Sequence, residues 1–172
     1  VCLNRGCIPT KALLHQADLA RRLAGSTDIF NLEGDLNARV DWAALTARPH
    51  KAVQRLTRGV GVMLEKAGVD VVQGRGRIIA AGEPASESDH PVRVAVLDDH
   101  GEQTNTLDAR HAIVATGARP RPLPDTPFDG RTILSSTDAL AVDKRPDQLV
   151  VLGAGAIGVE FADFFDAFGS RV

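Results

Sequence analysis

The sequence predicts an α/β fold, and three features carry this prediction. Apolar residues recur at helical spacing over 10–24 and 42–67. Residues 92–107 instead alternate apolar and polar side chains around a turn, which is typical of two antiparallel strands. Farther along, an apolar run at 149–152 leads through a glycine turn into a helix expected at 158–168. With 44% apolar residues, a chain of 172 residues is long enough for a sizeable core.

The helices have recognisable boundaries. Asp41 is a plausible N-cap for the second helix, and Gly68 fits its end. Pro49 lies inside this helix and is expected to kink or split it. Gly25 to Arg39 is rich in Gly, Ser, Asn and Asp and is expected to form a loop. One face of the last helix carries aromatic residues that predict packing rather than cofactor stacking: Phe161, Phe164, Phe165 and Phe168.

Short strands and a proline-rich stretch complete the expected order. Residues 69–72 and 111–115 are apolar and short, and each is expected to form a strand, the second one buried. Strands are also expected at 92–97 and 103–107. Four prolines fall in 120–127, where they exclude a helix or a sheet interior and mark a boundary or crossover.

Composition excludes several classes of protein. The formal charge is -2, which argues against an electrostatically driven nucleic-acid binder. The longest apolar run, 149–159, is broken by glycines and is shorter than the ~20 residues of a membrane helix. Two cysteines are too few for a disulfide-built secreted scaffold. We therefore expect neither nucleic-acid nor membrane partners.

The glycine turn has the pattern G-x-G-x-x-G between a strand and a helix. The first glycine permits the tight turn, the second lets the backbone approach a pyrophosphate, and the third lets helix and strand pack closely. We expect a nicotinamide dinucleotide to bind here; the alternative is a purely structural turn. The residue that separates NAD from NADP is expected ~20 residues farther on, so the preference stays open. The expected contacts are Gly153, Ala154, Gly155, Ala156, Ile157, Gly158 and Val159.

The cysteine pair lies five residues apart ahead of a helix. A regular helix would separate Cys2 and Cys7 by ~7.5 Å of rise, whereas a disulfide needs Cα atoms ~4.4–6.8 Å apart. The segment must therefore leave helical geometry for a bond to form, and Gly6 supplies that freedom. Pro9 at the helix start places Cys7 near the positive end of the helix dipole, and Lys11 adds a positive charge.

Other interpretations of these cysteines remain open at this point. Two free buried cysteines are the default for such residues. A zinc site would need two more ligands, and the five histidines are scattered, so no metal site is expected. A structural disulfide would close only a short loop and would stabilise little.

Residues 2–14, CLNRGCIPTKALL, resemble the redox-active segment of the flavin-dependent pyridine nucleotide–disulfide oxidoreductases, most closely in their lipoamide-dependent branch. Four more stretches agree with this family in the same order. They are GVDVVQGRG at 68–76, ATG at 115–117, SSTDAL at 135–140 and GAGAIGVE at 153–160. The stretches at 2–14 and 153–160 together are specific evidence for this family, whereas each of the three stretches between them is weak evidence by itself.

The resemblance implies electron transfer between a dithiol/disulfide substrate, the Cys2–Cys7 pair, FAD and NAD. Cys2 is then the interchange thiol and Cys7 the flavin-proximal one. Lys11 is implied to lie by the flavin and to pair with Glu160. The implied substrate is dihydrolipoamide, carried on the lipoyl domain of a 2-oxoacid dehydrogenase complex. The remaining implied FAD contacts are Gly76, Thr116, Gly117 and Ala118.

The resemblance also implies an architecture. Residues 1–117 correspond to the later part of a Rossmann-like FAD domain with an antiparallel ribbon, and 118–172 to the start of a Rossmann-like NAD(P) domain. The family's first FAD turn and its catalytic His–Glu pair have no counterpart in this sequence. We therefore expect an internal fragment of a longer, cytoplasmic protein that forms a homodimer. The fragment alone is expected to be inactive and poorly soluble.

Two rival interpretations are kept. One is another branch of the family, such as a mercuric or glutathione-type reductase. Alanine at 156 cannot act as the aromatic gate that some relatives carry there, which argues mildly against the glutathione type. The other is a non-catalytic dinucleotide-binding module in which Cys2 and Cys7 form a redox sensor or a simple staple.

Overall fold

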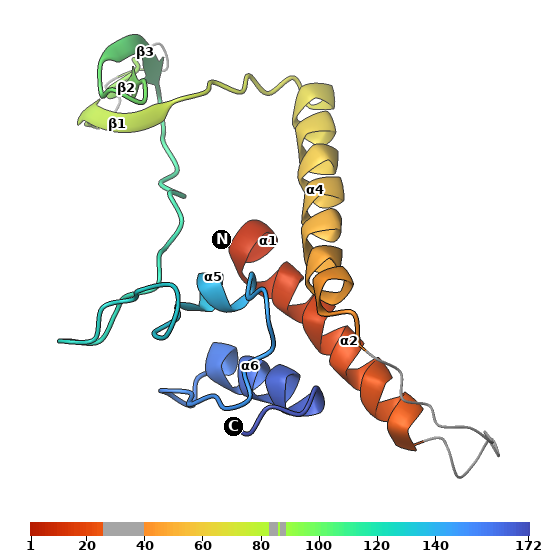
Figure 1. Cartoon of the computed structure of the whole chain (residues 1–172). Coiled ribbons are helices and arrows are strands. Elements are labelled where there is room, and N and C mark those ends of the chain that lie inside the picture. Colours follow the sequence, from red (N-terminus) through yellow and green to blue (C-terminus); the bar gives the residue numbers. More distant parts are fainter. Residues whose placement is uncertain (26–39, 83–85, 87–88) are drawn as a thin grey trace. The chain divides into compact units, whose positions relative to one another are not determined.

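A computed structural model describes residues 1–25, 40–82, 86 and 89–172 of the chain (Figure 1). The predicted loop at 25–39 lies, apart from Gly25, outside the described residues. Helices and strands are mixed, as predicted. Their bounds are α1 Cys2–Arg5, α2 Cys7–Gly25, α4 Trp42–Lys66, β1 Arg75–Ala80, β2 Val92–Leu97, β3 Gln103–Ala109, α5 Ser136–Ala139 and α6 Ala156–Ala167.

The chain forms two compact units. The first unit comprises residues 1–62 and 118–172, and the second comprises 63–117. This division follows contacts within the chain. The assignment of 1–117 and 118–172 to a flavin and a nicotinamide domain is a separate matter and stays a prediction.

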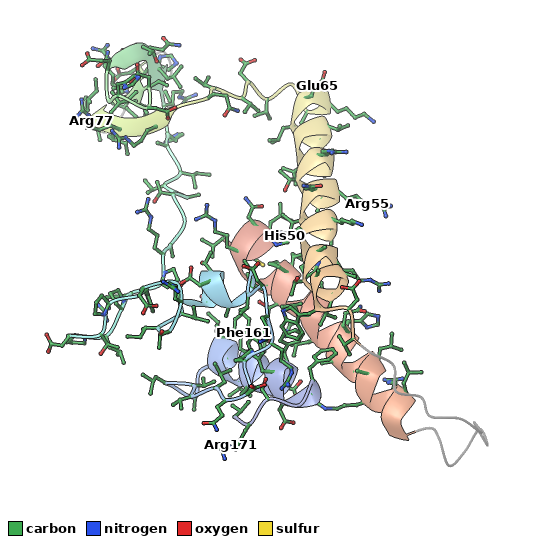
Figure 2. All side chains as sticks on the ribbon, viewed as in Figure 1. His50, Arg55, Glu65, Arg77, Phe161 and Arg171 are labelled. Carbon is green, nitrogen blue, oxygen red and sulfur yellow. The ribbon has the colours of Figure 1, made fainter. Side chains whose placement is uncertain are left out.

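The core of the first unit lies where α2, α4 and α6 meet. The indole ring of Trp42 packs against Phe164 and Phe165, with ring centroids 5.7 and 6.1 Å apart. The indole N–H also donates a 2.7 Å hydrogen bond to the carbonyl of Val142. Figure 2 shows Phe161 directed into this cluster. The aromatic face of α6 is therefore a packing face, as predicted. The buried members are Leu13, Ala17, Leu45, Leu140, Phe161, Phe164 and Phe165.

Helix α4 begins as predicted but runs on past its proline. Asp41 accepts a 3.0 Å hydrogen bond from the N–H of Ala44 and so caps the helix start. Pro49 is buried within α4 and does not split it, since the helix continues on both sides. Farther along, Val60 and Met63 are 45% and 70% exposed, so this apolar stripe contributes little to the core. None of the helices in the described ranges is long and apolar enough to cross a membrane.

The second unit is built on an antiparallel sheet of three strands in the order β1-β2-β3. Val94 of β2 pairs with Ile78 on one side and with Leu107 on the other. The predicted ribbon of β2 and β3 is therefore confirmed. Strand β1 was not predicted, because its Arg-Gly-Arg start has no apolar alternation. Its strand conformation comes from pairing with β2, which is a non-local contact.

Three strand predictions are wrong. Residues 69–72, 111–115 and 149–152 have no ladder of hydrogen bonds, and Ile113 and Val150 are 93% and 82% exposed. An apolar β-branched run needs a neighbouring strand to satisfy its backbone, and these runs have none among the described residues. A single parallel bridge joins Gln148 to Arg171 just before the third run.

Candidate redox and dinucleotide site

The two cysteines lie at a break between α1 and α2. Gly6 separates the helices with φ -139° and ψ -116°, which is not helical. The predicted departure from helical geometry is thus present. Both cysteines are free and exposed, so the interpretation as buried cysteines is wrong. The side chain of Cys7 hydrogen-bonds the thiol of Cys2, and this contact favours the protonated form and raises the pKa of Cys2.

Contact between two thiols is what dithiol–disulfide exchange requires. One sulfur attacks a substrate disulfide, and its neighbour then displaces the substrate from the mixed disulfide. Cys7 is the first residue of α2, where unpaired backbone N–H groups and the helix dipole favour negative charge. Within the described residues, no group of three His, Cys, Asp or Glu side chains is arranged to hold a metal ion.

Lys11 and Glu160 form an ion pair between α2 and α6, although 149 residues separate them in sequence. The structure confirms this pair, which the resemblance implied. The Glu160 side chain is 24% exposed and that of Lys11 is 64% exposed. The pair therefore lies at the surface of the first unit, where it ties the cysteine-bearing helix to the helix that follows the glycine turn.

A second ionic contact between these helices was missed by sequence reasoning. Nη2 of Arg21 lies 2.9 Å from Oδ1 of Asp163 and 3.6 Å from Oδ2 of Asp166. The same nitrogen donates a 2.9 Å hydrogen bond to the Asp163 carbonyl. The hydrogen bond to Asp163 raises the pKa of Arg21. The sequence signal for this contact was the spacing of Asp163 and Asp166, because residues three apart are neighbours on one face of a helix.

The glycine turn has the features that its motif predicts. Gly153 has φ +109°, a backbone conformation that L side chains rarely adopt. At Gly158 a Cβ would lie 2.5 Å from the carbonyl oxygen of Gly153, so glycine is required for the close packing. Gly155 is the N-cap of α6, and a Cβ there would meet nothing within 4 Å. The second glycine thus borders open space, as a pyrophosphate site would require.

A cavity of about 570 Å³ adjoins this turn. Gly153, Gly155, Ile157 and Gly158 line it, together with apolar side chains of the segment before the turn. Ala154, Ala156, Val159 and Glu160 do not line it. The volume falls in the range of small-molecule sites.

The remaining predicted flavin contacts are Gly76, Thr116, Gly117 and Ala118. Gly76 lies in β1 and pairs with Val96, and a Cβ there would make an ordinary 3.5 Å contact with Val94. Gly117 has φ +83°, which favours glycine. Gly76, Thr116 and Gly117 belong to the second unit, and Ala118 begins the later segment of the first. Their role toward FAD stays a prediction.

The SSTDAL stretch has a structural explanation that sequence reasoning missed. The Ser135 hydroxyl accepts from the N–H of Asp138, and the Asp138 carboxylate accepts from the N–H of Ser135 at 2.8 Å. This reciprocal arrangement is a capping box, and its S-x-x-D spacing was the signal. It fixes the short helix α5 and holds the following Leu140 in the core.

Comparisons with known proteins agree with this geometry. Residues 1–172 match the family described as pyridine nucleotide-disulphide oxidoreductase. Dihydrolipoyl dehydrogenase 2 of Haloarcula marismortui is 42% identical over 99% of this chain and 34% of its own length. Dihydrolipoyl dehydrogenase of Rhizobium etli is 39% identical over 100% of this chain and 36% of its own length.

A solved structure gives the same result. LpdA from Mycobacterium tuberculosis matches with a TM-score of 0.82 and 26% identity, over 98% of this chain and 34% of that one. The predicted fold class is confirmed by this match. The chain spans about a third of the length of the curated relatives it matches. It is a member of the pyridine nucleotide-disulphide oxidoreductase family.

Proposed function

We propose that this chain carries the redox-active dithiol of an FAD-dependent dihydrolipoyl dehydrogenase, which oxidises dihydrolipoamide and reduces NAD. The observation that carries the proposal is the contact between Cys2 and Cys7 at the start of a helix whose Lys11 pairs with Glu160. The pair joins the thiol-bearing helix to the helix after the glycine turn. Thiol chemistry and a dinucleotide turn therefore belong to one packed unit.

The protein's part of the reaction is a pair of thiol–disulfide exchanges. Starting from the Cys2–Cys7 disulfide, one substrate thiolate attacks the sulfur of Cys2 and releases Cys7 as a thiolate. The second substrate thiolate then attacks the substrate sulfur of the mixed disulfide and releases Cys2. The substrate leaves as a cyclic disulfide, its two protons pass through solvent to the released sulfurs of Cys2 and Cys7, and the protein holds the electron pair as a dithiol.

FAD, when bound, would supply a two-electron carrier between the dithiol and NAD. The chain's own residues would hold the two groups at different places. Gly76, Thr116, Gly117 and Ala118 would contact FAD through the backbone, with Lys11 close by. The turn 153–158 would hold the dinucleotide, where Gly155 leaves space for a phosphate and Gly158 keeps the helix close. Ala154, Ala156 and Val159 would complete the turn's contacts.

The names of the relatives support a proposal for the substrate and its carrier. Several are dihydrolipoyl dehydrogenases, which supports dihydrolipoamide as substrate and a lipoyl domain of a 2-oxoacid dehydrogenase complex as its carrier. Ala156 has no aromatic ring and favours this branch over the glutathione type. We also propose that 1–117 serves FAD and 118–172 serves the nicotinamide, in a cytoplasmic homodimer.

The test replaces each thiol in the FAD-loaded protein. Cys2→Ser and Cys7→Ser should each abolish NADH-dependent reduction of lipoamide, because the exchange needs both sulfurs. Reduction of ferricyanide by NADH should survive in both variants and serves as the control, since it bypasses the thiols. Full lipoamide reduction in either variant would refute the proposed role of the two thiols.

A further inference from the structure

A buried threonine lies in the first turn of α2, close in sequence to both cysteines. Thr10 is 6% exposed and shares one face of α2 with Leu13 and Ala17, which are 1% and 0% exposed. This core-facing position favours an apolar residue, because burying a hydroxyl costs free energy unless it finds a partner. The Thr10 hydroxyl has such a partner, since it donates a 2.8 Å hydrogen bond to the carbonyl oxygen of Gly6. The contact with Gly6 therefore distinguishes Thr10 from an apolar residue of the same size.

The carbonyl of Gly6 is held by two donors of the same residue. Besides the hydroxyl, the backbone N–H of Thr10 donates to this oxygen at 3.1 Å, as the helical pattern requires. The Thr10 side chain reaches the same atom because side chains on a helix lean toward its N-terminus. A peptide unit is planar, so two donors on one carbonyl oxygen fix the plane that also contains the N and Cα atoms of Cys7. Thr10 thereby fixes the orientation of the backbone from which the Cys7 side chain projects.

This peptide lies at the break that brings the two sulfurs together. Gly6 separates α1 from α2 with non-helical dihedral angles (Figure 1). Across this break, the Cys7 side chain hydrogen-bonds the thiol of Cys2. Helix α1 is a single turn, Cys2–Arg5, which is too short to be stable by itself. The contact between the sulfurs therefore depends on the rigidity of the Gly6–Cys7 peptide.

We propose that the Thr10 hydroxyl is a positioning group for the dithiol, which holds Cys7 against Cys2 through the Gly6–Cys7 peptide and so favours the disulfide form of the pair. A disulfide forms more readily between sulfurs that the chain already holds in contact, because less conformational freedom is lost when the bond closes. Without the hydroxyl, the peptide plane moves over a wider range and the two sulfurs spend less time in contact. The inference rests on the proposed function only in taking Cys2 and Cys7 as an exchanging pair.

The test measures the equilibrium between the two forms of the pair in the full-length protein, as purified. Buffers of reduced and oxidised dithiothreitol set the potential. When the pair is oxidised, Cys2 and Cys7 lose their S–H hydrogens and form one S–S bond, while the S–S bond of oxidised dithiothreitol breaks and takes up the two hydrogens. Alkylation traps the thiols that remain free. Trypsin cleaves after Arg5 and Lys11, so mass spectrometry quantifies Cys7 on the peptide 6–11.

Thr10→Val removes the hydroxyl and keeps the shape of the side chain. The Gly6 carbonyl keeps its backbone hydrogen bond in this variant, so no buried polar group is left unpaired and the protein should fold. The equilibrium constant for disulfide formation should fall about two- to tenfold, the range for the loss of one hydrogen bond. Such a fall raises the midpoint potential by about 10–30 mV. Thr10→Ser keeps the donor and should keep the wild-type midpoint.

Thr46→Val is the matched control. The Thr46 hydroxyl makes the same type of contact near the start of α4, where it donates a 2.9 Å hydrogen bond to the carbonyl of Trp42, four residues earlier. Both cysteines of residues 1–172 lie in α1 and α2, so the loss of this bond leaves the sulfurs in place. A merely structural role of the hydroxyl would appear in the unfolding free energy of both valine variants. Positioning of the dithiol should appear as a shifted midpoint potential in Thr10→Val alone.

The proposal is overturned if Thr10→Val keeps the wild-type midpoint, if Thr46→Val shifts it as far, or if Thr10→Ser shifts it as far as Thr10→Val. Because dithiothreitol reports on the thiol pair directly, the measurement needs neither NADH nor lipoamide and is separate from the test of the proposed function. Retained lipoamide reduction in the cysteine variants would refute the proposed role of the thiols in the dehydrogenase. It would leave the effect of Thr10 on the potential of the pair standing.

Discussion

Replacing Gly158 with alanine should destabilise the protein by about 2 kcal/mol. The added Cβ would lie 2.5 Å from the carbonyl oxygen of Gly153 and 3.1 Å from Cγ1 of Val151, where ordinary contacts begin at 3.4 Å. The close neighbour is backbone, which cannot rotate away, so α6 must move off the segment before the turn. Overpacking of this kind costs about 1–3 kcal/mol, and the higher helix propensity of alanine offsets at most about 1 kcal/mol.

The measurement is the free energy of unfolding from urea denaturation of the variant and the wild type. A loss of about 2 kcal/mol lowers the ratio of folded to unfolded protein roughly 30-fold. Gly155→Ala is the matched control, because its Cβ meets nothing within 4 Å. It should keep the stability to within about 1 kcal/mol but weaken NADH binding, since its methyl group would occupy the space proposed for a phosphate. A Gly158→Ala variant as stable as the wild type would refute the packing argument.

Three more outcomes follow from the described contacts. Cys7→Ala removes the hydrogen bond that raises the pKa of Cys2, so the pH midpoint of Cys2 alkylation, followed by peptide mass spectrometry, should move to lower pH; an unchanged midpoint would contradict this. Phe164→Ala should cost about 3–5 kcal/mol of unfolding free energy, because Phe164 is 1% exposed, whereas Leu23→Ala, at a 57% exposed site, should change it by under about 0.5 kcal/mol. Asp129 accepts hydrogen bonds from the N–H groups of residues 131–133, and these lower its pKa. The turn's stability should therefore be present above the ordinary pKa near 3.8 and be lost as the pH falls through the lower value of the folded state. Amide exchange at 131–133 measures this, and equal protection in Asp129→Asn would count against it.

The elements that could be predicted are those whose signal is local. The alternation at 92–97 and the turn after it define a hairpin within a short stretch of chain, and the structure has that hairpin. Asp41 and the helical spacing after it define the start of α4 in the same way. The face of Phe161 and Phe164 predicts burial because helical periodicity fixes which side chains share a side.

The elements that could not be predicted depend on partners far along the chain. Residues 149–152 have the composition of a buried strand, but a strand needs a neighbour, and the described chain offers one parallel bridge. Conversely, β1 is a strand without apolar alternation, because β2 supplies its hydrogen bonds. At the site, the family resemblance was needed for the Lys11–Glu160 pair, since no periodic pattern links residues 149 positions apart.

The sequence separation of Lys11 and Glu160 also sets a delay between their appearance during protein synthesis. At about 5–20 residues per second, Glu160 leaves the ribosome roughly 7 to 30 s after Lys11. The two cysteines, only five residues apart, both emerge within about one second. The nascent chain therefore exposes its complete dithiol for many seconds before α6 exists to pack against α2.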